Sequence, residues 1–231
     1  MATTIRKKHS NLTAAEWKAF IDAVNALHGV QAAAPAYRDF VKVHATAMSM
    51  EGMSWAVHTM GPTMPGRNFL AWHRWFVRTL EKRLQQVDPS VFIPYWDWMA
   101  DPQIPAQVSS PALLSSWSVT RHWKPAQMPS AAVLAGATSQ TTFPFFQRML
   151  EAGAHNAVHN AVGGDMASGS SPSDPLFWLH HANIDRIWAV WQKQHPKGKP
   201  PNKSEILEPS PMFGIKVSSV LSITKLGYRY G

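Results

Sequence analysis

The chain has 231 residues, of which 45% are hydrophobic and 16% charged, so it can bury a sizeable core as one compact domain. It contains no cysteine, which excludes disulfides, thiolate-bound metals and cysteine nucleophiles. Its net charge of +8 is spread along the chain without a recognition motif, so we expect no nucleic-acid partner. No run of about 18 apolar residues occurs, so we also expect no association with a membrane through a spanning helix.

The N-terminal part of the chain predicts an arm and then a helix. Residues 1–10 are polar and basic, and we expect them to form a loose arm. Thr13 and Glu16 have the spacing of a capping box, which predicts a helix that runs from here to about His28. The arm has no apolar signal-peptide core, so cytoplasmic residence is the default expectation, although a partner could carry the protein out.

The next part predicts two helices on either side of a loop. Residues 35–50 and 68–87 each have an apolar face at helical spacing, and the loop at 51–66 is rich in Gly, Pro and Met. Each of the three segments carries a histidine that we single out, and those in the helices lie on the apolar faces. In chain order these histidines are His44, His58 and His73.

Methionines are unusually frequent around the middle histidine of this group. They occur at positions 48, 50, 53, 60 and 64, close to His58 in the sequence. Thioethers can bind Cu(I), so a role in acquiring copper is conceivable. We expect adaptable packing to be their main use, because methionine fills irregular gaps in protein interiors.

Residues 102–142 are rich in Pro, Ser, Ala and Gln. We expect a long surface excursion here, whose conformation and role the sequence leaves open. A fourth helix is predicted at about 144–162 and holds His155 and His159. Their i, i+4 spacing directs both imidazole rings toward one point, as a shared metal ion would require.

A fifth helix is predicted at 174–194. It begins with Asp174-Pro175, a hydrogen-bond acceptor followed by proline at the first helical position. Two adjacent histidines, His180 and His181, lie inside this apolar, tryptophan-rich run. Imidazoles in such a setting usually need a partner, so the pair is a candidate for metal binding.

The expected architecture is mainly α, a helical bundle with long loops and few short strands. We expect a single domain over residues 1–231, with its core at about 35–195 and residues 196–231 as a closing segment. The sequence contains no internal repeat, coiled-coil heptad pattern or second core. We also expect no C-terminal shielding domain, because the chain ends soon after its core.

The histidines of these segments form two sets of three, which we expect to face each other across the bundle. Neutral imidazoles without carboxylate or thiolate suit copper, and also zinc, nickel or iron. The Glu-x-x-His pairs of carboxylate-bridged di-iron sites are absent around them, as is the His-Glu-x-x-His pattern of zinc proteases. The first set is His44, His58 and His73, and the second set is His155, His159 and His181.

Two motifs around these histidines carry a family resemblance. The first is Phe69-Leu-Ala-Trp-His73-Arg74, and the second runs from Asp174-Pro175 through His181 to Asp185. Further matches lie in segments 95–98, 155–159, 162–166 and 228–230. The sequence resembles the tyrosinase family of type-3 copper proteins, which includes tyrosinases, catechol oxidases and molluscan haemocyanin units. It resembles the small bacterial enzymes most.

The resemblance implies two copper ions as cofactors and O₂ as co-substrate. In the family pattern the second histidine of the pair binds the metal, so His181 is the implied ligand and His180 supports it. The loop after His58 is longer than is usual in the family, and His58 is its only candidate ligand. The implied ligands are His44, His58 and His73 for copper A, and His155, His159 and His181 for copper B.

The resemblance also implies an activity, the ortho-hydroxylation of monophenols with O₂ and the oxidation of o-diphenols to o-quinones. A catechol oxidase or an o-aminophenol oxidase is the nearest alternative, and an O₂ carrier like a haemocyanin unit is a more distant one. The expected lack of a covering domain favours an enzyme over a carrier. The expected partners are small phenolic substrates and, as in some small bacterial relatives, a caddie protein that loads copper.

Five further residues have implied roles. Glu151 and Asn156 match a carboxylate and an amide that hold a water, which can act as a relay base for the phenol proton. Phe177 matches an aromatic wall for the substrate ring. Ser168 falls at the family's gate position, where a small side chain should leave the approach to copper A open. Asn160 falls at a position thought to tune activity.

Overall fold

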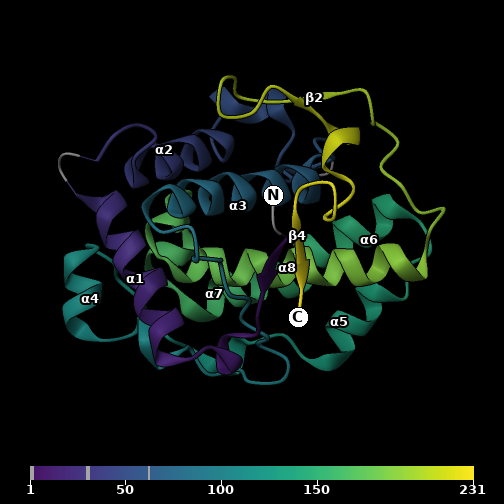
Figure 1. Cartoon of the computed structure of the whole chain (residues 1–231). Coiled ribbons are helices and arrows are strands. Elements are labelled where there is room, and N and C mark those ends of the chain that lie inside the picture. Colours follow the sequence, from purple (N-terminus) through teal and green to yellow (C-terminus); the bar gives the residue numbers. More distant parts are fainter. Residues whose placement is uncertain (1–2, 30–31, 62) are drawn as a thin grey trace.

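The computed structural model describes residues 3–29, 32–61 and 63–231 and shows a mainly helical protein (Figure 1). The expected helical fold with long loops and few short strands is confirmed for these residues. None of their helices is long and apolar enough to cross a membrane. The α-helices are α1 (Ala14–His28), α2 (Tyr37–Ala47), α3 (Phe69–Val87), α4 (Pro111–Ser116), α5 (Ala131–Thr138), α6 (Phe143–Leu150), α7 (Asn156–Val162) and α8 (Leu176–Gln194).

Among the described residues, four short strands form two small sheets. Strands β1 (Thr4–Arg6) and β4 (Tyr228–Tyr230) pair in parallel, and β2 (Ile206–Leu207) and β3 (Ile215–Lys216) pair in antiparallel. Each sheet has only two strands, so the strands fasten loops and chain ends to the helices. The core of the protein therefore consists of helices packed against one another.

Helices α3 and α8 pack together at the centre of the molecule, as Figure 1 shows. Helix α8 is buried on nearly every side, and its Trp178, Trp188 and Trp191 are fully buried. Burying even a Leu or Phe side chain stabilises a fold by roughly 1.5–3 kcal/mol. The larger tryptophans therefore anchor neighbouring elements, and the Trp191 ring stacks on Phe146 of α6 with centroids 4.4 Å apart.

Of the two helix starts predicted from capping residues, the one at α1 is confirmed and the one at α8 is shifted, because Pro175 is the N-cap of α8 and provides no side-chain cap. At α1 the capping box is confirmed, since Thr13 Oγ1 accepts from the backbone N–H of Glu16 and Glu16 accepts from that of Thr13. At α8 the Asp174 carboxylate accepts from the backbone N–H of Leu176 at 2.8 Å, so the helix begins two residues later than predicted. Arg121 binds the same carboxylate with two nitrogens, at 2.6 and 2.7 Å.

The predicted helix at 144–162 contains an interruption that its sequence does not reveal. Between α6 and α7, residues Glu151–His155 form a π-helical turn, in which the N–H of Asn156 donates to the carbonyl of Glu151. Such wide turns are rare and occur frequently at functional sites. This one carries two residues with predicted roles, Glu151 and His155.

The prediction that residues 1–10 form a loose arm is wrong for the described part, residues 3–10. Strand β1 pairs with β4 near the other end of the chain, and Arg6 is completely buried. The Arg6 guanidinium donates to both carboxylate oxygens of Glu81 at 2.9 Å and reaches Asp185 at 3.3 Å. The polar composition of residues 1–10 suggested an exposed arm, but Glu81 of α3 and Asp185 of α8 are buried carboxylates that attract Arg6 into the core.

Those carboxylates belong to a network that joins the two central helices to the closing segment. Asp185 of α8 binds Arg74 of α3 and also accepts from the hydroxyl groups of Tyr228 and Tyr230, both at 2.5 Å. Burial alone would raise the pKa of Asp185, but Arg74 and Arg6 outweigh it and hold that pKa below its ordinary value. The network is therefore charged, and it lies one turn beyond His181 on α8.

The excursion at 102–142 is ordered by packing against the helices. The Trp117 side chain is buried, and its indole N–H donates to the Asn25 side chain of α1 at 2.7 Å. The backbone N–H groups of His122 and Lys124 donate to carbonyls at the end of α7. Gly164 permits a close approach of the same segment after α7, since a Cβ there would lie 2.0 Å from the Thr120 carbonyl oxygen.

Candidate metal centre

Histidines from the four helices α2, α3, α7 and α8, from the π turn and from one loop meet near the central helices. They form two groups, within each of which the nitrogens able to bind a metal lie within 4.8 Å of one another. The rings of His73 and His181 stack with centroids 4.2 Å apart, so the groups face each other as predicted. The first group is His44, His58 and His73, and the second is His155, His159, His180 and His181.

Hydrogen bonds at Nδ1 orient most of these rings. In His44, His73 and His159, Nδ1 lies 2.6–2.9 Å from the carbonyl oxygens of Gly169, Phe69 and Met166. A carbonyl can only accept, so each Nδ1 carries the proton and the lone pair is left on Nε2. This is the tautomer in which Nε2 binds a metal ion.

The remaining nitrogens of the groups point to a missing partner. Nε2 is buried without a hydrogen bond from the described residues in His44, His58, His73 and His155. A buried polar atom left unpaired costs about 1–3 kcal/mol, and several in one place are rare in native proteins. Metal ions held by these nitrogens would satisfy them, so the chemistry of the donors fits the two-copper centre implied by the sequence.

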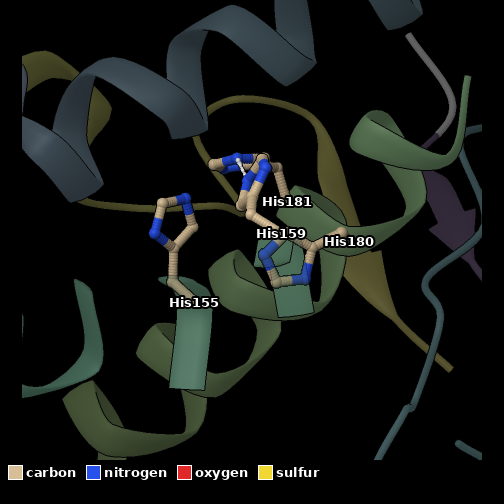
Figure 2. Close-up of side chains that lie close together, drawn as sticks. All are labelled: His155, His159, His180 and His181. Carbon is tan, nitrogen blue, oxygen red and sulfur yellow. Dashed lines mark hydrogen bonds between the residues drawn. The ribbon is translucent and has the colours of Figure 1, made fainter. Parts of the chain in front are cut away.

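The second group contains a direct geometric sign of a shared ion. Figure 2 shows the His159 and His181 rings together, with Nε2 of each 3.3 Å apart. Two nitrogens bound to one first-row metal at about 2.0–2.1 Å with a tetrahedral angle lie roughly 3.3 Å apart. The two imidazoles therefore already have the separation that joint ligation requires.

Trp98 distinguishes the two adjacent histidines of α8. Its indole N–H donates to Nδ1 of His180 at 3.2 Å. An indole is a donor only, so His180 Nδ1 must be unprotonated and the proton of the neutral ring lies on Nε2. In that tautomer His180 has no free lone pair for the metal, whereas His181 does. The hydrogen bond therefore supports His181 as the ligand and His180 as its neighbour.

The electrostatic setting keeps the imidazoles neutral. Burial lowers the pKa of His44, His73, His155 and His181 well below the ordinary value, and the neighbouring imidazoles lower it further. The pKa of His159 falls to about 4, chiefly through burial. Since only a neutral imidazole can bind a metal, the site is ready for an ion at neutral pH.

The two predicted catalytic residues each contact a histidine of a different group. Asn156 Oδ1 lies 2.9 Å from Nδ1 of His155. The Glu151 carboxylate is 3.6 Å from Nδ1 of His58 and accepts from the backbone N–H and the hydroxyl of Thr59, both at 2.8 Å.

A cavity of 240 Å³ opens onto the histidines. Asn156, predicted as catalytic, and Asn160 and Ser168, predicted for the substrate pocket, all line it. Glu151 does not, since it lies behind His58 and borders a separate cavity with Thr59 and Gln147. The other residues that line the 240 Å³ cavity are His44, Met48, His58, His155, His159, Met166, Ala167, Gly169 and Ser171.

The structure corrects the predicted role of Phe177. Its side chain is completely buried and does not line the cavity. Its ring packs against the rings of His44 and His181, with centroids 5.0 and 4.1 Å away. Phe177 therefore fixes the positions of ligand candidates from α2 and α8 and does not form a wall of this open pocket.

Several groups that shape the site were absent from the sequence interpretation. The carbonyls of Gly169 and Met166 orient two histidines, and Thr59 holds the carboxylate behind a third. Main-chain carbonyls have no residue signature, so no sequence signal could have identified them. The Trp98 side chain could have been found only as part of the aromatic segment after α3.

Comparison with known proteins agrees with this geometry. A family model described as the common central domain of tyrosinase matches residues 34–136 and 118–194. The chain is 32% identical to a tyrosinase of Streptomyces glaucescens, over 84% of each chain. It is 30% identical to hemocyanin units G and H of Sepia officinalis, over 87% of this chain and 40% of the hemocyanin.

Solved structures show the same fold. The polyphenol oxidase of Grenache grape (Vitis vinifera) matches 100% of this chain and 85% of its own, with a TM-score of 0.76 at 19% identity. The family match and the two facing histidine groups together define a dinuclear metal protein of the type-3 copper class. The chain belongs to the tyrosinase family. Proteins of this family use two copper ions, each held by three histidines, and the two groups fit that requirement.

Proposed function

We propose that this protein is an enzyme that uses O₂ to hydroxylate monophenols at the ortho position and to oxidise o-diphenols to o-quinones. The observation that supports an enzyme is the 240 Å³ cavity. It is bordered by His44 and His58 of the first histidine group and by His155 and His159 of the second. A phenolic ring can therefore approach both metal positions from outside.

The bound copper pair would supply the redox chemistry with O₂. The residues of the protein bind the phenol and handle its proton. A free phenol has a pKa of about 10, so attack on its ring at neutral pH benefits from a base beside the hydroxyl. Asn156 lines the cavity, and among the described residues no hydrogen bond uses its Nδ2 group. That group can hold a water or the phenol oxygen.

We assign the second half of this relay to Glu151. Its carboxylate is nearly buried and lies 3.6 Å from Nδ1 of His58, at the start of the π turn that Asn156 ends. A water held by the Asn156 amide in the cavity would receive the phenol proton, and the Glu151 carboxylate behind His58 would stabilise the positive charge. The two hydrogen bonds from Thr59 keep the carboxylate in place.

The experiment compares a monophenol with its catechol in the copper-loaded protein, followed by quinone absorbance. Asn156→Ala and Glu151→Gln should slow monophenol turnover much more than catechol turnover. Asn11→Ala is the matched control, because it removes an exposed amide that does not line the cavity. If both activities fall equally and bound copper falls with them, these residues only position the histidines and the relay is wrong.

The same assay separates the alternative activities. A protein that oxidises catechol or o-aminophenol but not the monophenol is a catechol oxidase or an o-aminophenol oxidase. Reversible O₂ binding without any quinone would establish an oxygen carrier, the more distant alternative, to which the similarity with hemocyanin units points. Either result would overturn the proposed monophenol hydroxylation.

A further inference from the structure

A second hollow beside the metal centre is lined by methionines. It measures 480 Å³ and is lined by Met50, Met53, Met60 and Met64, and it reaches His58. Met50 is 77% exposed and Met64 is 38% exposed. Methionine is usually buried in folded proteins, so this concentration on one open surface calls for an explanation.

Core packing does not account for these side chains. Met53 and Met60 are partly buried, but neither packs against the hydrophobic core, whereas Met99, Met128 and Met212 do. Our expectation that the methionines near His58 serve mainly as adaptable packing is therefore wrong for the four that line this hollow. Their side chains line a space that is open to solvent and reaches a histidine of the metal centre.

The backbone holds the four methionines in two adjacent turns. The N–H of Met53 donates to the carbonyl of Met50 at 3.4 Å, within the 3₁₀ turn Glu51–Trp55. The N–H of Met60 donates to the carbonyl of Met64 at 3.0 Å, which closes the loop between them. The pairs thus come from both flanks of His58, and folding brings them together.

His58 connects this hollow to the catalytic cavity, since it lines both. Its Nε2 is buried and has no hydrogen bond from the described residues. Thioether sulfur is a soft ligand that selects Cu(I) over harder ions such as Mg²⁺ or Ca²⁺. An ion bound among the methionines would therefore lie next to the one histidine shared by the two spaces.

We propose that Met50, Met53, Met60 and Met64 form an uptake site that captures Cu(I) from outside and transfers it to His58. The transfer is a ligand exchange, in which bonds to sulfur are replaced by a bond to Nε2 of His58, with no change in oxidation state. The proposal rests on the copper centre of the family and not on the proposed reaction with phenols. Loss of phenol oxidation would leave it unaffected.

The test begins with binding to the copper-free protein under anaerobic conditions. Cu(I) is supplied from a complex with bicinchoninate, whose colour reports the transfer, and methionine methyl groups labelled with ¹³C are followed by NMR. The His58→Gln variant should still show shifted methyl signals for the four methionines, because capture precedes transfer. Absence of any shift at these four methyl groups would overturn the proposal.

Loading kinetics test the second half of the proposal. The quadruple variant Met50→Leu, Met53→Leu, Met60→Leu and Met64→Leu keeps the bulk of each side chain and removes sulfur. It should load copper about tenfold more slowly, the change expected from a tenfold loss of capture affinity. It should reach the same final copper content with an unchanged circular dichroism spectrum.

The matched control replaces methionines outside the hollow, with Met149→Leu and Met212→Leu. Met149 is 39% exposed on α6, so it resembles the methionines under test in accessibility. The control should load at the rate of the unaltered protein. If the quadruple variant also loads at that rate, the methionines take no part in uptake and the proposal is wrong.

Discussion

Removal of the Arg6 side chain should destabilise the whole protein. Arg6 is fully buried and donates two hydrogen bonds of 2.9 Å to Glu81, and its guanidinium carbon lies 3.8 Å from the centre of the Tyr228 ring. In Arg6→Met the apolar stem is largely kept, but Glu81 and Asp185 lose a shared cation. Breaking a buried ion pair by removing one partner costs about 3–5 kcal/mol.

That cost predicts a measurable change in thermal stability. For a chain of this size, about 2–4 °C of melting temperature is lost per kcal/mol, so the expected decrease is roughly 6–20 °C. Arg78 also binds Glu81 at 2.7 Å and remains in the variant, which favours the lower part of that range. Differential scanning calorimetry of the copper-free and copper-loaded proteins measures the change.

Lys7→Met is the matched control for this prediction. Lys7 is the neighbouring basic residue, and its ion pair with Glu16 lies near the surface with 39% of the lysine side chain exposed. Surface pairs contribute about 0–1 kcal/mol, so this variant should melt close to the unaltered protein. If Arg6→Met melts no lower than Lys7→Met, the N-terminal segment does not stabilise the core and our reasoning is refuted.

Two further predictions concern the metal centre. His181→Gln should lower bound copper from two ions per chain to one, whereas His180→Gln should keep two. Copper analysis after dialysis measures this, and the reverse pattern would show that the Trp98 hydrogen bond does not determine the ligand. The copper-free protein should lose stability as the pH falls from 6.5 to about 4, because the unfolded chain gains a proton on His159 that the folded chain resists. Melting curves across this range should show the loss, which should be at least as large when copper holds the ring deprotonated, because the folded state then resists protonation more strongly. A flat profile without copper would contradict the assignment.

The helices and the ligand candidates could be predicted because their signals are local. The Thr13–Glu16 box lies within one helical turn, and the apolar faces that carry His44 and His73 follow the helical repeat. The His155 and His159 pair could be identified from its i, i+4 spacing and from the motif that contains it. The start of α8 was predicted within two residues, because Asp174 accepts a hydrogen bond from the first helical N–H even though Pro175 is the N-cap.

The failures involve contacts between distant parts of the chain. Arg6 looked exposed because nothing near it in the sequence is acidic, yet folding brings it to Glu81, 75 positions away. Phe177 looked like a pocket wall, but its ring is enclosed by His44 and His181. The methionines looked like packing residues, and only the paired turns around His58 show that they line an open hollow.

The sequence by itself determined which residues can hold metal in this protein and on which helices they lie, because ligand type and helical spacing are properties of short segments. The tertiary structure decided how each of those residues is used. Carbonyls of Gly169 and Met166 fix two imidazoles, Trp98 sets His180 apart from His181, and Thr59 holds Glu151 beside His58. These are hydrogen bonds and packing contacts whose partners meet only when the helices assemble, so no local pattern could specify them.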